Sequence, residues 1–91
     1  MQIEFDSNKN EANVLSRGLS FEQVIDFDFE TAVFKHDTRR DYGETRIRAL
    51  GFLGDRLHAV VFTETAKGIR VISFRKANRR EVQIYEQETQ T

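Results

Sequence analysis

Three strand-like stretches separated by two short turns constrain the fold more than any other feature of this chain. The stretches are Thr45–Phe52, Leu57–Glu64 and Ile69–Lys76, and the turns contain Gly54-Asp55 and Ala66-Lys67-Gly68. Turns this short join neighbouring antiparallel strands, and no proline interrupts the stretches. A fourth stretch, Thr31–His36, precedes them. We therefore predict a four-stranded antiparallel meander.

The residues before this sheet predict a short strand and two helices. Gln2–Phe5 has strand character, and Asp6 or Ser7 can cap a helix that ends before Gly18. Ser20 opens the second helix, because Ser20 and Gln23 match a capping box. The apolar residues of the second helix recur at helical spacing, and we expect Phe21, Val24, Ile25 and Phe29 to form its buried stripe.

A last helix is predicted after the sheet. Asn78 is a suitable N-cap, Glu81 stands at the third helical position, and Val82 and Tyr85 share one helical face. The chain is thus expected to be a single α+β domain over residues 1–91. Two helices can cover only one face of the sheet, which leaves the other face for solvent, a ligand or a partner.

The composition excludes several kinds of site. The chain has no cysteine, so it cannot form disulfides, thiolate metal sites or a cysteine nucleophile. Its two histidines and scattered acids lack metal-ligand spacing, and no glycine-rich phosphate loop is present, so we expect neither metal nor cofactor. No apolar run is long enough to span a membrane, and residues 1–10 lack the pattern of a secretory signal, so we expect neither a transmembrane helix nor secretion. A cytoplasmic protein without a membrane partner is the expectation.

Charge is distributed unevenly along the chain. Residues 1–34 hold seven acids and two bases, residues 35–80 hold twelve bases and five acids, and residues 81–91 hold three acids. The chain therefore has a basic middle segment although its net charge is only −1. A basic face supports phosphate binding whatever the total charge, although the same side chains can simply solvate exposed strands.

The basic residues can be assigned to strand faces and to one helix start. Alternation places Arg46 and Arg48 on one side of their strand. In the last strand it places Arg70 and Lys76 on one side and Arg75 on the other. Arg79 and Arg80 fall in the first turn of the last helix, where cations are electrostatically unfavourable. This arrangement is typical of an anion-binding site, and the alternative is an exposed helix start paired with nearby acids.

RNA is an anion that such residues can cleave without a metal. The 2′-hydroxyl attacks the adjacent phosphate, arginine and lysine stabilise the added charge, and a proton acceptor and donor are required. The candidates for proton transfer are His36, His58, Glu64, Glu81 and Tyr85. Each has a structural alternative: Glu81 as a helix cap, His58 and Tyr85 as packed side chains, His36 as polar surface.

The order of short motifs resembles the BrnT toxin family over about nine-tenths of the chain. The opening resembles it in Asp6-x-x-Lys9-Asn10-x-x-Asn13 and Arg17-Gly18-x-Ser20-Phe21-Glu22, and the middle in Gly43-Glu44-x-Arg46 and Ala49-Leu50-Gly51. The end resembles it in Val61–Glu64, Ile69–Arg75 and Ala77-x-Arg79-Arg80-Glu81-x-x-x-Tyr85-Glu86. One departure is Ser16-Arg17-Gly18, where the family usually reads Lys-His-Gly.

The resemblance implies a RelE-like fold and a type II toxin that cleaves RNA and inhibits translation. It also implies a ribbon-helix-helix antitoxin, BrnA, through which the complex would contact DNA. We expect Arg46, Arg75, Arg79 and Arg80 to act on the phosphate, Glu81 and Tyr85 to transfer protons, and Arg48, Arg70 and Lys76 to bind RNA. The alternatives are a binding module that does not cleave, or an inactive homologue that acts with its antitoxin.

Overall fold

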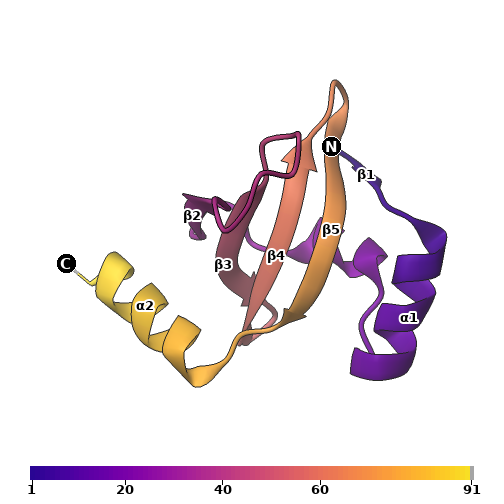
Figure 1. The fold of residues 1–91 in the computed structure, drawn as a ribbon. Coiled ribbons are helices and arrows are strands. Elements are labelled where there is room, and N and C mark those ends of the chain that lie inside the picture. Colours follow the sequence, from indigo (N-terminus) through magenta and orange to yellow (C-terminus); the bar gives the residue numbers. More distant parts are fainter. Residues whose placement is uncertain (91) are drawn as a thin grey trace.

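The computed structural model describes residues 1–90, which form an α+β fold with one five-stranded sheet (Figure 1). In chain order the elements are β1 (Gln2–Glu4), α1 (Ser7–Arg17), the 3-10 helix η1 (Phe21–Asp26), β2 (Val33–His36), β3 (Ile47–Leu53), β4 (Arg56–Glu64), β5 (Gly68–Lys76) and α2 (Arg79–Thr89). The predicted strands and hairpin turns are therefore present, with ends that differ by one or two residues. This order is consistent with the expected RelE-like architecture, although the N-terminal part has one α-helix and one 3-10 helix where two helices were predicted.

The sheet is mixed and not purely antiparallel. Strands β2 to β5 form the predicted meander, and β1 adds to its edge in the order β1-β5-β4-β3-β2. The β1 strand runs parallel to β5, with Gln2 opposite Gly68. A Cβ at Gly68 would overlap the backbone of Gln2, so a residue with a side chain cannot stand there without a shift. A parallel pair between two distant segments leaves no short turn in the sequence, which is why the pattern of turns did not predict it.

A β-bulge in β5 corrects the predicted assignment of its side chains to faces. Val61 lies opposite Ser73 and Phe62 opposite Val71, so Ile72 is an extra residue between them. The extra residue reverses the alternation along β5. Arg70 and Arg75 consequently share one face, and Lys76 belongs to the other, with His58 as its cross-strand neighbour. We call the face that carries Arg75 the open face.

The core lies on the opposite face, beneath η1. Phe21, Val24 and Phe27 are buried there with β-strand residues that include Val60 and Phe74. Spacing of three residues is the period of a 3-10 helix. That period explains why Ile25, predicted to be buried, is 54% exposed. Phe29 lies beyond the end of η1 and is half-buried.

Polar side chains attach α1 to the rest of the molecule. The helix begins at the predicted cap, Asp6, ends at Gly18 in the left-handed region, and has no buried residue. Asn13 Nδ2 donates to the carbonyls of Leu19 at 3.0 Å and Phe74 at 2.9 Å, and Asn10 Oδ1 accepts from the Phe21 amide at 2.7 Å. Two asparagines therefore fix the angle at which the chain passes from α1 into η1 and onto the sheet.

Replacing Asn13 by alanine is expected to lower the free energy of unfolding by about 1–3 kcal/mol, because two partly buried carbonyls would lose their donor. Urea unfolding followed by circular dichroism measures this change. Leu15→Ala is the matched control, since Leu15 is 88% exposed and its truncation should change the unfolding free energy by less than about 0.5 kcal/mol. Equal midpoints for both variants would show that Asn13 does not anchor the helix.

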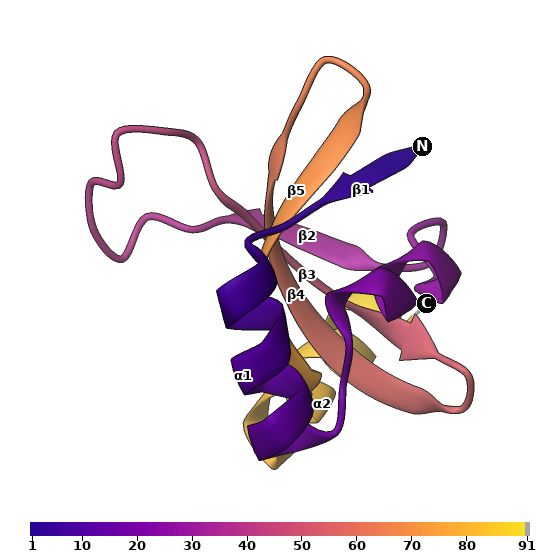
Figure 2. The same cartoon turned by 90° about the vertical axis from the view of Figure 1, so that its right-hand side faces the viewer.

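The C-terminal helix α2 packs on the open face, whereas α1 and η1 lie on the opposite side of the sheet. Figure 2 shows α1 and η1 in front of the strands and α2 behind them. Tyr85 packs edge-on against Phe52 with ring centroids 5.5 Å apart, and its hydroxyl donates to the Thr31 carbonyl at 3.0 Å. The helix covers only part of this face. Within residues 1–90, no helix has the length and apolar character needed to cross a membrane.

Candidate active site on the open face of the sheet

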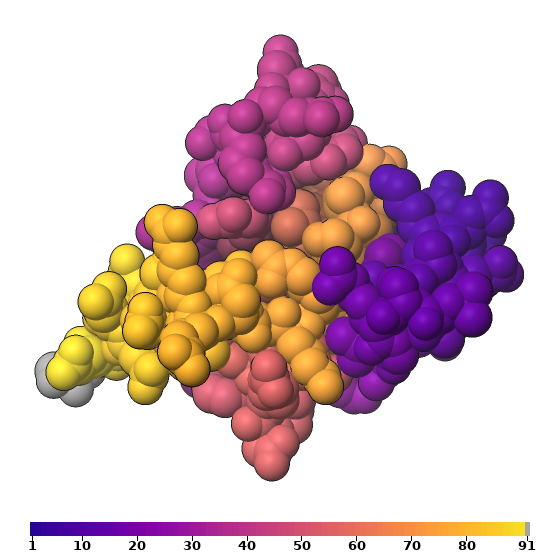
Figure 3. Space-filling view, turned by 60° about the horizontal axis from the view of Figure 1, so that its bottom comes forward, coloured from indigo at the N-terminus to yellow at the C-terminus, as the bar shows by residue number. Residues whose placement is uncertain are grey.

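A cavity of about 140 Å³ lies on the open face between α2 and the loop of residues 37–46. Figure 3 shows the corresponding hollow between this loop, in magenta, and α2, in yellow. Its apolar walls come from β2, β3, β4 and one turn of α2, whereas β5 contributes only polar side chains. The polar and charged side chains that line it are Lys35, Arg39, Arg48, Ser73, Arg75 and Glu81.

The central contact of the cavity is an ion pair between Arg75 on β5 and Glu81 on α2. Arg75 donates through Nη1 to Glu81 Oε1 at 2.7 Å and through Nη2 to Oε2 at 2.9 Å. The hydrogen bond from Arg75 lowers the pKa of Glu81, and Arg48 adds to this effect. The carboxylate is therefore ionised at neutral pH and held against the sheet.

Glu81 has a second role as a helix cap, as predicted. Its Oε1 accepts from the Asn78 amide at 2.9 Å, and Asn78 Oδ1 accepts from the Glu81 amide at 2.9 Å. The capping box and the ion pair use the same carboxylate. The start of α2 is thereby fixed relative to Arg75, and the geometry of the cavity depends on this one side chain.

Cross-strand pairing brings two further cations into the cavity. Lys35 on β2 is directly opposite Arg48 on β3, and Arg48 is opposite Val61 on β4. Opposed residues of an antiparallel pair point to the same face. Ser73, opposite Val61 on the other side, adds a hydroxyl. Lys35 is half exposed and lies 4.0 Å from the Glu88 carboxylate, a weak surface ion pair that leaves its ammonium accessible.

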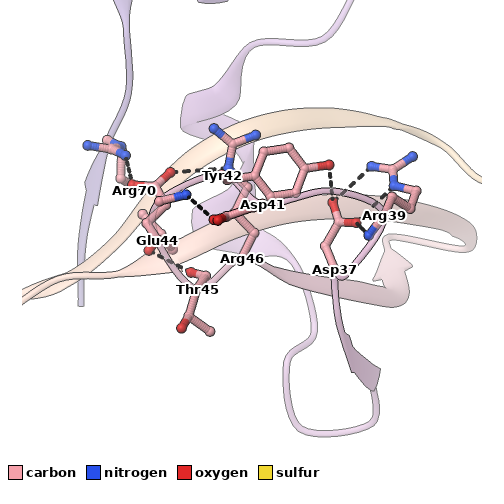
Figure 4. A network of polar contacts seen from close by, with 10 residues as sticks. Asp37, Arg39, Asp41, Tyr42, Glu44, Thr45, Arg46 and Arg70 are labelled. Carbon is pink, nitrogen blue, oxygen red and sulfur yellow. Dashed lines mark hydrogen bonds and ion pairs between the residues drawn. The ribbon is translucent and has the colours of Figure 1, made fainter.

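The loop of residues 37–46 contributes Arg39. Figure 4 shows this guanidinium against the Asp37 carboxylate, with Nε to Oδ1 at 2.8 Å and Nη2 to Oδ2 at 2.9 Å. The Asp37 side chain is 1% exposed, whereas that of Arg39 is 63% exposed. The hydrogen bond from Arg39 lowers the pKa of Asp37 to about 2. Arg39 also repels Arg75, which opposes the rise in the Arg75 pKa caused by Glu81.

Arg46 and Arg70 lie on the same face of the sheet but outside the cavity. Both pair with Glu44, Arg46 through Nε at 3.1 Å and Arg70 through Nη2 at 2.7 Å (Figure 4). The hydrogen bond from Arg46 has the larger effect in lowering the pKa of Glu44, and the hydrogen bond from Arg70 lowers it further. The guanidinium of Arg46 also stacks on the Tyr42 ring at 4.0 Å. Of the arginines predicted on strands, the cavity therefore brings together Arg48 and Arg75 and leaves Arg46 and Arg70 around Glu44.

The remaining candidates lie around the site or away from it. Arg79 and Arg80 are exposed in the first turn of α2, and Lys76 is exposed on the other face. The Tyr85 hydroxyl is bound to the Thr31 carbonyl and does not line the cavity. His58 is buried, its Nδ1 is 2.8 Å from the Arg56 carbonyl, and burial lowers its pKa. His36 and Glu64 line an apolar groove on the core side.

Comparison with known protein families shows to which family the chain belongs. A family model described as the ribonuclease toxin BrnT of type II toxin-antitoxin systems matches residues 5–81. The chain belongs to the BrnT family. The matched region contains every charged residue that lines the cavity and ends at Glu81. A search of curated proteins finds no match.

Membership in the BrnT family indicates which kinds of molecule the chain meets. A ribonuclease toxin of a type II system acts on RNA and is held in check by a protein antitoxin. Among residues 1–90 there is no group of three or more histidine, cysteine, aspartate or glutamate side chains placed to hold a metal ion. The Ser16-Arg17-Gly18 departure lies at the end of α1, where a basic residue in the last turn is electrostatically favourable, and none of the three lines the cavity.

Sequence reasoning missed three residues of the BrnT cavity. Lys35 could have been found by pairing the predicted strand Thr31–His36 with its neighbour, since the register places it opposite Arg48. Ser73 could have been found by alternation, because it stands two residues before Arg75 and therefore on the same face of β5. Arg39 carried no sequence signal, because the position of a loop residue depends on its tertiary contacts.

The low pKa of Asp37 predicts a loss of stability in acid. A carboxyl whose folded pKa of about 2 lies below its ordinary value of 3.8 stabilises the fold fully above about pH 4, and this contribution disappears as the pH falls toward 2. Urea midpoints measured between pH 6 and pH 2.5 should therefore fall less steeply in Asp37→Asn than in the unsubstituted protein. Parallel curves would mean that Asp37 does not contribute to the acid dependence.

Proposed function

We propose that this BrnT-family chain cleaves RNA in the cavity on the open face, by attack of the 2′-hydroxyl and without a metal ion. The observation that carries the proposal is that four cations, Lys35, Arg39, Arg48 and Arg75, line one cavity together with the Glu81 carboxylate. Like charges repel, so a site that assembles four cations in a small cavity is suited to an anion. The phosphodiester of RNA is the anion that the family's ribonuclease activity provides.

The residues of the cavity match the steps of the proposed reaction. The 2′-oxygen attacks phosphorus as its proton passes to the Glu81 carboxylate, which is already ionised. Arg75 and Arg48 stabilise the negative charge that accumulates on the phosphoryl oxygens. The bond from phosphorus to the 5′-oxygen then breaks, and that oxygen takes up a proton from a water molecule. The products are a 2′,3′-cyclic phosphate and a 5′-hydroxyl.

The outlying basic residues are proposed to bind the RNA on either side of the cleaved bond. Arg79 and Arg80 are exposed beside Glu81, and Arg46 and Arg70 lie at the other end of the open face. Contacts to flanking phosphates raise affinity and make it salt-dependent. Lys76 lies on the far face but close to the start of α2, where it can reach only a strand that bends around β5. Tyr85 stays a second candidate for proton transfer.

The partner that we propose is a ribbon-helix-helix antitoxin that neutralises the toxin and carries the complex to DNA. Membership in a type II family supports a protein antitoxin. The antitoxin's DNA-binding part would then repress the shared promoter, and this chain would contact DNA only through it. Copurification of the two proteins followed by a gel-shift assay on the promoter tests this proposal. Binding by the toxin alone would contradict it.

The decisive experiment is incubation of the purified protein with a defined RNA in EDTA, followed by analysis of the product ends. We expect cleavage that yields cyclic phosphate and 5′-hydroxyl ends. Loss of all cleavage in EDTA, with recovery on adding Mg²⁺, would contradict the metal-independent mechanism. A parallel preparation of Glu81→Gln guards against a contaminating ribonuclease, because the contaminant would be equally active in both preparations.

A second candidate function is favoured by the Arg75–Glu81 pair itself. In the free protein this pair neutralises both groups that the cleavage mechanism uses. A chain that kept the pair closed on binding RNA would bind without cutting, as an inactive homologue that acts with its antitoxin. Intact RNA in the experiment above, with or without ribosomes, together with measurable RNA binding would favour this function.

A further inference from the structure

We propose that Arg39 contacts the phosphate at the cleaved bond and that Asp37 is the positioning residue that holds it there. This inference rests on the proposed function and extends it to the loop of residues 37–46. The loop lies beside the cavity and is separated from the Arg75–Glu81 pair in the sequence. The fold brings the loop to this pair, because Arg39 lines the same cavity as Arg75 and Glu81.

The geometry of the Asp37–Arg39 pair leaves the guanidinium both fixed and available. Nε and one N–H of Nη2 donate to the carboxylate, and the guanidinium also interacts with the Tyr42 hydroxyl. A guanidinium carries five N–H donors in a rigid fork. At least two of the five donors therefore remain for an incoming anion, and they are presented by a side chain that is 63% exposed and lines the cavity.

Asp37 is itself anchored from several directions. Its amide donates to the Arg46 carbonyl at 2.7 Å, which continues the pairing of β2 with β3 into the loop. Its carboxylate also accepts from the Arg39 amide at 3.4 Å and from the Tyr42 hydroxyl at 3.4 Å. The Tyr42 ring is in turn stacked by Arg46. The carboxylate thus has a fixed position, and its two hydrogen bonds with Arg39 fix the position of the guanidinium as well.

A role in stability alone does not account for this arrangement. The lowered pKa of Asp37 means that the pair stabilises the fold above about pH 4, but stability alone does not require its exposed partner, Arg39, to line the cavity. The pair also places Arg39 where it repels Arg75. Fixing a cation near a second cation is unfavourable in the free protein and becomes favourable when an anion lies between them.

The test compares Arg39→Ala, Arg39→Lys and Asp37→Asn in single-turnover cleavage of a defined RNA, with Arg40→Ala as the matched control. Arg40 has the same charge in the same loop but does not line the cavity. We expect Arg39→Ala to lower the maximal cleavage rate about 10²-fold, and Arg39→Lys to have a rate between those of Arg39→Ala and the unsubstituted protein. The cleavage rate of Arg40→Ala should equal that of the unsubstituted protein. An effect on the RNA concentration dependence alone would overturn the contact at the cleaved bond.

Combining the substitutions isolates the positioning role. Asp37→Asn alone should lower the rate about tenfold, through a misplaced guanidinium, and should have no further effect in the Arg39→Ala background. Equal losses in both backgrounds would show that Asp37 acts on the fold and not through Arg39. Thermal melting identifies any unfolded variant, and the exposed Arg39 variants keep the test valid if Asp37→Asn does not fold.

Failure of this inference can be told apart from failure of the proposed function. If the protein cleaves RNA, Glu81→Gln does not, and Arg39→Ala cleaves normally, only the inference is overturned. If the unsubstituted protein leaves RNA intact, the proposed function fails. Affinity for an uncleavable 2′-O-methyl RNA then decides the role of Arg39: weaker binding by Arg39→Ala than by Arg40→Ala supports a phosphate contact, and equal binding overturns it.

Discussion

Glu81→Gln is expected to lower the rate of RNA cleavage by roughly 10²–10⁴-fold, the usual contribution of a general base. Glutamine at the third position of a helix still completes a capping box, so the start of α2 should keep its geometry. What the substitution removes is the negative charge that accepts the 2′-hydroxyl proton and that faces Arg75. The measurement is single-turnover cleavage at saturating protein, which separates the chemical step from RNA binding.

The matched control is Glu86→Gln, which removes one charge from the exposed surface of the same helix. It should cleave at the rate of the unsubstituted protein. If Glu81→Gln also cleaves at that rate while its helix remains intact by circular dichroism, Glu81 is a helix cap only. The proton acceptor must then be sought elsewhere, and Tyr85→Phe is the next variant to measure.

Phe74→Ala is expected to destabilise the fold by about 3–5 kcal/mol, a large share of the roughly 5–15 kcal/mol that holds a typical domain together. Phe74 is 0% exposed, lies opposite Val60 in the sheet, and has its ring 5.3 Å from that of His58. Truncation would leave a void between β4, β5 and the residues that follow α1. Urea unfolding should show a much lower midpoint, with an unchanged dependence of the unfolding free energy on urea.

Ile25→Ala is the informative comparison for Phe74→Ala. A regular α-helix starting at Ser20 would bury Ile25, and its truncation would then cost about 2–5 kcal/mol. In the 3-10 helix the side chain is 54% exposed. We therefore expect a change below about 0.5 kcal/mol. A large loss of stability in Ile25→Ala would contradict the period assigned to η1.

Features determined by local interactions could be predicted from the sequence. The capping boxes of Ser20 with Gln23 and of Asn78 with Glu81 are both present, as is the left-handed Gly18 at the end of α1. Gly54 also has a positive φ, in the β3–β4 turn. Each of these depends on residues a few positions apart. The sequence therefore contains both partners of the interaction within one short window.

Features that depend on distant residues could not be predicted in this way. The parallel pairing of Gln2 with Gly68 and the entry of Arg39 into the cavity both arise from contacts across the fold. The bulge at Ile72 is a local feature, but no residue type marks it. The bulge decides which basic residues of β5 share the open face, and the loop contacts decide that Arg39 joins them at the cavity. The basic segment was thus recognised correctly, while its division into a cavity group and a Glu44 group required the structure.

The bulge in β5 also gives this strand a way to absorb a change of length. Val71 lies opposite Phe62 and Ser73 opposite Val61, so the two residues that flank Ile72 already pair with consecutive residues of β4. Deleting Ile72 would therefore leave a regular strand in which Phe74 still faces the core and Arg75 still faces the cavity. In β3, which pairs with β4 without a bulge, a one-residue deletion would instead move every side chain beyond it to the other face. Single-residue deletions scanned along both strands should therefore be tolerated beside Ile72 and be damaging in the middle of β3.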